Sequence, residues 1–390
     1  MEKNLPLITS AMLVLTHRCN LRCRYCFVNQ KPESMSLETA FDAVRFLIHN
    51  AEQSGDVPQI NFFGGEPMLM WDSIIVPLTT WIRSEYKKPF QIGMTSNGTL
   101  LNDDRIQFLK DYRINLLFSI DGAKPTQDYN RPYHNGKGSF DSLADIIPKV
   151  ASNFRSATFR STVIPPTCHH VFENIMFAKE SGFNHFYIVP NVFEKWTEEH
   201  KIILKGELDK YVDYYIDEYH NARTPIAFST LEDAFLDIKR INGAITANQY
   251  RTLTQCSACG KCGLGAGRYA SIHPDGNIYG CQEMTSIGGS DNIFYIGNIY
   301  TGVENDRRVS LMNLFDSTPA TGSNCNTCKY NRVCTGGCVA NNYLINGSLS
   351  VNPDMFCWWQ QIVLESAIRI MQTLGNEQNE QFKEKWSTQR

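Results

Sequence analysis

The sequence predicts an α/β protein: a partial (β/α)6 TIM-like barrel followed by a small cysteine-rich C-terminal domain. Strand-like and helix-like segments alternate up to about residue 190, and each polar or glycine-rich motif in this region follows a strand-like segment. Nine of the 13 cysteines lie between Cys256 and Cys357, after the alternation has ended. About six βα units are visible, which is fewer than the eight that close a TIM barrel.

Apolar periodicity assigns the elements of the alternating region in order. Strands are expected at Met12–Leu15, Gln59–Phe63, Phe90–Met94, Asn115–Ile120, Ala157–Ile164 and Phe186–Val189. Helices are expected at Leu37–His49, Trp71–Tyr86, Asp103–Tyr112, Phe140–Ala151 and Val171–Ser181. Such alternation favours parallel strands joined by crossover helices, with ligands at the carboxyl ends of the strands.

The chain is predicted to divide into a core (residues 1–190), a bridge of two helices (191–250), a cysteine-rich domain (251–365) and a C-terminal helix with its tail (366–390). Within the cysteine-rich domain, Asp275-Gly276 indicates a tight turn between strands at Arg268–His273 and Asn277–Tyr279. The polar stretch Glu377–Arg390 is expected to fray.

Composition excludes several classes of protein. The chain has 390 residues, 42% of them hydrophobic and 20% charged, and a formal net charge of −3, so neither disorder nor non-specific nucleic-acid binding is expected. No apolar run reaches the roughly 18 residues of a membrane span, and no secretory signal precedes the first strand. We therefore expect a cytoplasmic protein, in which 13 reduced thiols indicate metal binding or catalysis rather than disulfides.

Cys19, Cys23 and Cys26 lie close together on the loop that follows the first predicted strand. Three thiolates on one loop can hold three corners of an iron–sulfur cubane and leave the fourth iron open for a catalytic ligand. Structural zinc is the alternative, and His17 is available as the fourth ligand that it needs. The spacing of the cysteines alone leaves both interpretations open.

The loop reads CNLRCRYCF and resembles the radical S-adenosylmethionine (radical SAM) superfamily. The resemblance continues over roughly residues 10–190, through GGEP at Gly64–Pro67, TSNGTLL at Thr95–Leu101 and SIDG at Ser119–Gly122. It implies that the three cysteines hold a [4Fe–4S] cluster, which cleaves SAM to a 5′-deoxyadenosyl radical that removes hydrogen from a substrate. The implied SAM-binding residues are Tyr25, Gly64, Gly65, Glu66, Ser96, Asn97, Ser119, Asp121, Arg131 and Val189. Taken alone, GGEP also suits a simple turn, and Tyr25 a packed loop aromatic.

A second cysteine pattern occupies the C-terminal region, and its CxxC-type pairs taken alone are also typical of zinc ribbons. The whole spacing resembles the SPASM extension of radical SAM enzymes, which implies two auxiliary [4Fe–4S] clusters and three clusters in all. By this resemblance one auxiliary cluster is held by Cys256, Cys262, Cys281 and Cys338, and the other by Cys325, Cys328, Cys334 and Cys357. Cys168 and Cys259 are left over, and Cys259 is a rival to Cys256.

SPASM-bearing enzymes mostly modify peptides or proteins. The resemblance thus implies an oxidoreductase of post-translational modification that forms a thioether or carbon–carbon crosslink in a ribosomally made peptide (RiPP maturation). The alternative is an anaerobic sulfatase-maturating enzyme, which makes formylglycine with an aspartate base directly after the third auxiliary cysteine. Gln282 stands there, and a glutamine cannot take up a proton. A non-catalytic iron–sulfur or zinc module is the alternative of another class, and it would need no SAM pocket.

The implied partners are a peptide or protein substrate and an electron donor such as flavodoxin or ferredoxin. Only 18 residues precede Cys19, so no fused peptide-recognition domain is expected at this end. Either a separate leader-recognition protein or the edge of the sheet would present the peptide. Neither a nucleic acid nor a membrane is expected as a partner, and the sequence does not identify the catalytic acid or base.

Overall fold

The computed structural model describes residues 5–154, 157–243, 267–286, 289–316, 325–334 and 336–387. Its chain contacts separate two compact units. The first comprises Met1–Ser119, Arg131–Ala157 and Lys261–Thr318, and the second comprises Ile120–Asn130, Thr158–Gly260 and Pro319–Arg390. The predicted domains are continuous in sequence, with boundaries at residues 190, 250 and 365, whereas each unit combines separate segments. The domain boundaries therefore stay a prediction.

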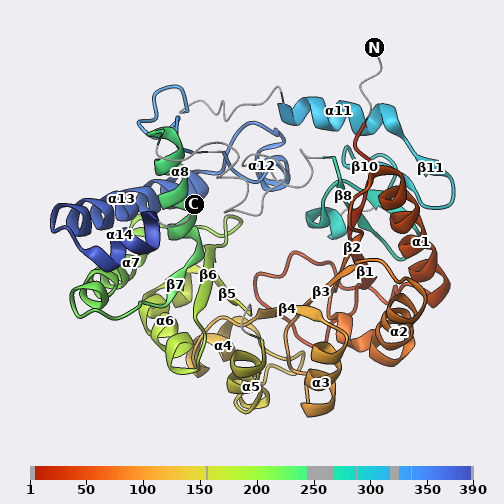
Figure 1. Cartoon of the computed structure of the whole chain (residues 1–390), viewed down its shortest axis with the longest axis horizontal. Helices are drawn as coiled ribbons and strands as arrows, with labels where there is room; N and C mark the ends of the chain where they lie inside the picture. The colour runs from red at the N-terminus through yellow and green to blue at the C-terminus, as the bar shows by residue number, and fades with distance from the viewer. Residues whose placement is uncertain are drawn as a thin grey trace. The chain divides into compact units, whose positions relative to one another are not determined.

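Four parallel strands form the centre of the first unit (Figure 1): β1 (Ser10–Thr16), β2 (Gln59–Gly64), β3 (Gln91–Ser96) and β4 (Ile114–Ser119). In β2 and β4 the buried residues alternate with more exposed ones, whereas β1 and β3 have continuous buried runs. The parallel order brings the carboxyl ends of these strands to one edge of the sheet, where the predicted motifs lie.

Three helices cover one face of these strands (Figure 1): α1 (Leu37–Ser54), α2 (Val76–Glu85) and α3 (Asp103–Asp111). Helix α1 begins where the Ser36 side chain accepts a hydrogen bond from Thr39 N, and it ends at Gly55, whose φ of 75° is the left-handed conformation that favours glycine. Ala40, Ala43, Val44, Leu47 and Ala51 are buried, which fixes the face that packs on the sheet.

The hairpin predicted in the cysteine-rich region is confirmed and belongs to the first unit. Strands β8 (Tyr269–Ile272) and β9 (Asn277–Tyr279) are antiparallel, and Gly276 between them has a φ of 81°. Strand β8 also pairs in parallel with β1, so Ser10 lies opposite Tyr269. Strands β10 (Tyr295–Asn298) and β11 (Gly302–Val303) and helix α11 (Asn305–Asp316) complete this part.

The second unit contains the parallel strands β5 (Phe159–Val163), β6 (His185–Pro190) and β7 (Ala227–Phe228). Its helices are α4 (Lys124–Asn130), α6 (Val171–Glu180), α7 (Glu198–His220), α8 (Ser229–Ile241), α12 (Val339–Asn346), α13 (Asp354–Asn376) and α14 (Glu380–Ser387). The two helices predicted for the bridge are α7 and α8. Their aromatic residues form the core, since Tyr211 packs edge-on against Phe186 and donates to Ile226 O at 2.8 Å.

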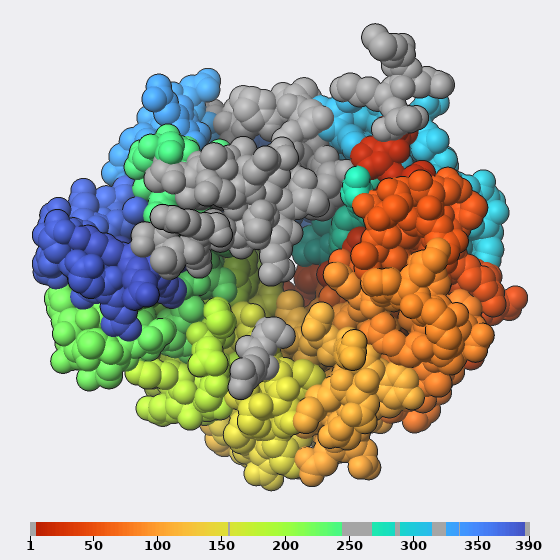
Figure 2. All heavy atoms as spheres, in the orientation of Figure 1, coloured from red at the N-terminus to blue at the C-terminus, as the bar shows by residue number. Residues whose placement is uncertain are grey.

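One local prediction was wrong, and two predicted helices differ in detail. The tail was expected to fray, but it forms helix α14, because Phe382 and Trp386 are buried against Phe235 of α8. Figure 2 shows the blue atoms of the C-terminal helices packed against the green atoms of α7 and α8. The helix expected from Trp71 begins with a π-helical turn, Trp71–Ile75. The helix expected from Phe140 is divided into a 3-10 turn, Phe140–Ser142, and α5 (Ile146–Asn153).

Candidate functional site

The loop that carries Cys19, Cys23 and Cys26 begins at the end of β1. Two backbone contacts with a second loop hold it in place: Leu21 forms a bridge with Tyr133, and Arg22 N donates to Pro132 O at 2.7 Å. Burial, together with the charges of Glu66 and the other two cysteines, raises the pKa of the Cys19 thiol to about 12. Because these thiols interact with one another, the loop offers a donor set that suits iron.

Gly64 and Gly65 press the end of β2 against the start of this loop. Gly65 N donates to Thr16 O at 2.8 Å, and Glu66 N donates to Arg18 O at 2.9 Å. A Cβ atom on Gly64 would lie 2.2 Å from Thr16 O, and one on Gly65 would lie 2.1 Å from Arg18 O. Only glycine permits this approach of two backbones.

The Glu66 carboxylate is buried and joins the end of β2 to the end of β3. It accepts hydrogen bonds from Met68 N at 3.0 Å, Ser96 Oγ at 2.8 Å and Asn97 N at 2.8 Å. Burial raises the pKa of Glu66 to about 7, although these hydrogen bonds act in the opposite direction. The side chain therefore holds the GGEP and TSNG segments together.

Asn97 links the end of β3 to the cysteine loop. Its Nδ2 atom lies 3.8 Å from Cys19 Sγ and 2.9 Å from Asn20 Oδ1. Its Oδ1 atom accepts from Thr99 N and Thr99 Oγ1, which fixes the orientation of the amide. Three strand ends, those of β1, β2 and β3, therefore meet at Cys19.

Tyr25 and Arg131 lie together beside the loop, with the guanidinium carbon of Arg131 5.4 Å from the centroid of the Tyr25 ring. Arg131 is buried. A cavity of about 750 Å³ opens next to the loop, lined by residues 22–24, 26–30, 132–134 and 136. The sequence analysis missed His134, whose Nε2 atom lies 3.0 Å from Cys19 O. No sequence motif includes His134. The one signal for its place at the site is that it lies three residues after Arg131 in the sequence.

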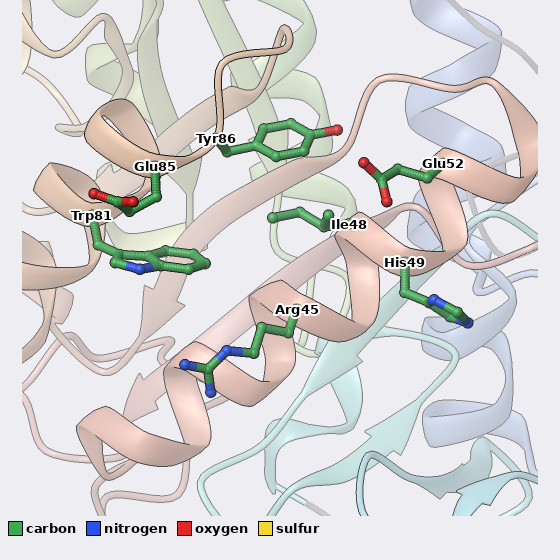
Figure 3. Close-up of a pocket in the computed structure, with 7 residues that line it drawn as sticks. All are labelled: Arg45, Ile48, His49, Glu52, Trp81, Glu85 and Tyr86. Carbon is green, nitrogen blue, oxygen red and sulfur yellow. The ribbon is translucent and has the colours of Figure 1, made fainter.

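A smaller cavity of about 240 Å³ lies between α1 and α2 (Figure 3). Its lining comes from the helices and Tyr86 and includes Arg45, whose guanidinium carbon is 5.8 Å from the Trp81 ring centroid. None of its lining residues is a predicted site residue.

The remaining predicted SAM-binding residues are Ser119, Asp121 and Val189. Ser119 is half-buried at the end of β4 in the first unit, whereas the other two belong to the second unit. The carboxylate of Asp121 accepts from Thr162 N at 2.9 Å and from Asn130 Nδ2 at 3.0 Å. Val189 is half-buried on β6. The structure thus brings most predicted SAM-binding residues together in the first unit, and Asp121 has a clear structural role in the second.

Four cysteines of the second pattern lie near one another in the second unit. Burial, with the charges of Cys325 and Cys328, raises the pKa of Cys334 and raises that of Cys357 to about 11. In the described part of the chain, no three His, Cys, Asp or Glu side chains converge on one metal ion.

The other predicted ligand set is only partly described. Cys281 is half-buried in the first unit, and Cys338 is exposed in the second. Cys256, Cys259 and Cys262 lie outside the described residues. Cys168 is buried away from these patterns, with its Sγ atom 3.8 Å from His200 O.

The profile of the radical SAM superfamily matches residues 13–204, the region that contains β1, the cysteine loop and the GGEP segment. Residues 13–204 form a radical SAM domain. The match confirms the family predicted from the CNLRCRYCF loop. In the described residues, no helix is long and apolar enough to cross a membrane.

Two relatives match most of the length of this chain. A cysteine-type anaerobic sulfatase-maturating enzyme of Clostridium novyi is 23% identical over 365 residues, which is 87% of this chain and 89% of that protein. The radical SAM cyclopropyl synthase TigE of Paramaledivibacter caminithermalis is 22% identical over 351 residues, 85% of this chain and 68% of that protein.

A solved structure shows the same fold. The structure of anSMEcpe with bound AdoMet and Cp18Cys peptide superposes with a TM-score of 0.74 and 18% identity, covering 94% of this chain and 99% of that one. This likeness confirms the predicted fold class, a partial TIM-like barrel of α/β type.

Proposed function

We propose that this radical SAM enzyme is a peptide or protein maturase that forms a thioether or carbon–carbon crosslink in a ribosomally made peptide. The observation that carries the proposal is the meeting of Cys19, the Gly64-Gly65 turn and Asn97 at the ends of three neighbouring strands. A protein that only stores or transfers clusters has no need of this arrangement beside its thiols. The peptide in the anSMEcpe structure and the name of TigE support a peptide substrate and bond formation, respectively.

In this proposal the loop cysteines hold a [4Fe–4S] cluster that supplies the electron for cleavage of SAM. The chain's own residues bind and orient SAM. The backbone of Gly64 and Gly65 faces its methionine group, and the buried Arg131 supplies a positive charge for its carboxylate. The aromatic ring of Tyr25 lies near the adenine. The other residues proposed to line this pocket are Glu66, Ser96, Asn97, Ser119, Asp121 and Val189.

We also propose two auxiliary [4Fe–4S] clusters, which brings the total to three. Cys325, Cys328, Cys334 and Cys357 hold one, and the mutual electrostatic effects of these thiols support that set. Cys256, Cys262, Cys281 and Cys338 hold the other. The radical SAM core is then residues 1–190, the helical bridge 191–250 and the SPASM domain 251–365, followed by a C-terminal helix and tail, 366–390.

Gln282 favours crosslinking over formylglycine formation. Its Oε1 atom accepts a hydrogen bond from the Tyr269 hydroxyl and lies 3.9 Å from Cys281 Sγ. An amide oxygen cannot act as the base that formylglycine formation needs at this position. The two relatives do not separate the alternatives, because their identities to this chain are nearly equal.

The proposed partners follow from this chemistry. A one-electron donor such as flavodoxin or ferredoxin reduces the first cluster, and a separate leader-recognition protein presents the peptide. The proposed location is the cytoplasm, where the thiols stay reduced.

Anaerobic reconstitution followed by assays for iron, sulfide and 5′-deoxyadenosine tests the proposal. We expect SAM cleavage under reductant and its loss when Cys19, Cys23 and Cys26 are replaced by alanine. Zinc in place of iron, or cleavage that survives the triple replacement, contradicts the proposal. Mass spectrometry of candidate peptides then separates a two-hydrogen loss, which a crosslink produces, from the conversion of a cysteine to an aldehyde, which also exchanges sulfur for oxygen. Oxidation of a serine to an aldehyde has the same two-hydrogen loss as a crosslink, so trapping with a hydrazine reagent, which reacts only with the aldehyde, separates those two products.

A further inference from the structure

Two side-chain amides point at the sulfur atoms of a single CxxC pair. Asn352 Nδ2 lies 4.0 Å from Cys325 Sγ, and Gln361 Nε2 lies 4.0 Å from Cys328 Sγ. An amide nitrogen can only donate, so both contacts are N–H···S hydrogen bonds. All four residues belong to the second unit.

The orientation of the Asn352 amide is fixed by its oxygen. Oδ1 accepts from Gly337 N at 2.9 Å and from Asn342 Nδ2 at 3.0 Å. Because a backbone N–H can only donate, the amide oxygen must face Gly337, and the nitrogen must then face Cys325. Asn352 is only 8% exposed, so little water competes for this contact.

Neighbouring residues hold this amide in place. Asn342 Nδ2 also donates to Leu349 O at 3.0 Å, which anchors the second donor to Asn352. A Cβ atom on Gly337 would lie 2.6 Å from Asn352 Oδ1. Glycine at this position therefore leaves the space that the Asn352 amide occupies. The arrangement is therefore built from several residues between Gly337 and Asn352.

We propose that Asn352, together with the half-buried Gln361, raises the reduction potential of the auxiliary cluster held by Cys325, Cys328, Cys334 and Cys357. The inference rests on the proposed function, which gives these thiols a [4Fe–4S] cluster. The reduced form of such a cluster carries one more negative charge than the oxidised form. An N–H group directed at a ligand sulfur stabilises that charge, and hydrogen bonds to sulfur are among the factors that set cluster potentials.

The replacement Asn352→Asp tests this inference sharply. Aspartate has nearly the same shape and keeps an oxygen for Gly337 N and Asn342 Nδ2, but it replaces the donor beside Cys325 with a negative oxygen. The matched control is Asn346→Asp, because Asn346 is exposed in the same segment and its Nδ2 atom donates to Val351 O at 2.8 Å. Both variants change the net charge equally.

The midpoint potential is measured by EPR-monitored redox titration in a background that lacks the first-loop cysteines. We expect the midpoint potential of one auxiliary signal to become more negative in Asn352→Asp. The shift should correspond to a several-fold change in the one-electron equilibrium constant, for which a tenfold change is about 59 mV. We expect Asn346→Asp to match the parent protein and Gln361→Leu to shift the same signal less.

The outcomes separate this inference from the proposed function. If Cys325→Ala and Cys334→Ala leave the iron content unchanged, the proposed auxiliary cluster is wrong. If those replacements remove iron but Asn352→Asp titrates like Asn346→Asp, the cluster stands and the inference is overturned. If Asn352→Asp binds less iron than the parent protein, its midpoint potential is not compared, and that of Gln361→Leu is measured instead. A midpoint potential in Gln361→Leu equal to that of the parent protein overturns the inference.

Discussion

The amide nitrogen of Asn97 lies 3.8 Å from the sulfur of Cys19, although the two residues are 78 positions apart in the sequence. Replacing Asn97 with alanine removes this contact and the hydrogen bond to Asn20 Oδ1. Because partners of metal ligands typically contribute a factor of about 10 to 100 in affinity or activity, we expect 5′-deoxyadenosine formation to fall by that factor. Iron assays accompany the rate measurement. The control is Asn153→Ala, at the end of α5, and an equal loss in both variants would contradict the assignment.

Gly65→Ala tests the close approach of β2 to the cysteine loop. The new Cβ atom would lie 2.1 Å from Arg18 O, a backbone atom that cannot move without the loop. We expect loss of bound iron and a lower melting temperature. Gly206→Ala in α7 is the matched control, since a Cβ there meets nothing within 4 Å and alanine favours a helix by about 1 kcal/mol. A Gly65→Ala protein with full iron content and wild-type melting would refute the steric argument.

His273 makes stability depend on pH. Burial, followed by the charges of His17 and Lys31, lowers the pKa of His273 from 6.5 to about 3. The folded state keeps this ring neutral, so its contribution is complete above pH 6.5 and is lost as the pH falls toward 3. We expect His273→Phe to lower the slope of unfolding free energy against pH in this range by up to about 1.4 kcal/mol per pH unit. Denaturant titrations at several pH values measure it, and parallel curves for the two proteins would disprove the prediction.

Cys168→Ala should leave the iron content unchanged. Its Sγ atom is directed at His200 O rather than at another thiol, and burial raises the pKa of Cys168 to about 11. We expect a loss of about 1 kcal/mol in stability, typical of a small buried truncation. Cys334→Ala is the comparison, because the proposed ligand set predicts that it removes about four irons. Iron loss in Cys168→Ala would require a different ligand set.

Trp386→Ala should destabilise the second unit. The indole ring is only 5% exposed and packs edge-on against Phe235 with 4.8 Å between ring centroids. Truncation of a buried tryptophan costs about 3 kcal/mol or more. Thermal unfolding measures this loss, with the half-exposed Lys383 of the same helix replaced by alanine as the control. If both variants melt alike, α14 contributes nothing to the core.

The sequence predicted most of the strands, because buried parallel strands produce clear apolar runs between turns. It did not predict α4, since residues 124–130 have almost no apolar periodicity. It also could not show that the last helix packs on the core, because Phe382 and Trp386 are the only large apolar residues of a polar segment. Tertiary contacts determine such elements, and these contacts are not visible in local patterns.

At the candidate site, the sequence identified most of the residues but did not show which of them hold neighbouring segments together. Glu66 and Asp121 were expected to bind the cofactor. That expectation stays a prediction, and the structure adds that the Glu66 carboxylate joins the ends of β2 and β3 while that of Asp121 accepts a hydrogen bond from Thr162 N. The contacts of Asn352 and His134 with the cysteine segments were not predicted, because each depends on a loop conformation that no short motif encodes.

The pairing of β1 with β8 has a consequence for biosynthesis. Strand β1, which precedes the first cysteine loop, pairs on one side with β2 and on the other with β8, where Ser10 to Leu13 lie opposite Tyr269 to Ile272. Strand β2 follows β1 closely in the sequence, whereas β8 comes more than 250 residues later. A ribosome must complete most of the polypeptide before that second neighbour exists. Pairings of such long range fold slowly. We expect the cysteine loop to stay incompletely folded during synthesis, with its thiols exposed to solvent. Iron would then be delivered in the cell after the finished chain is released rather than during its synthesis.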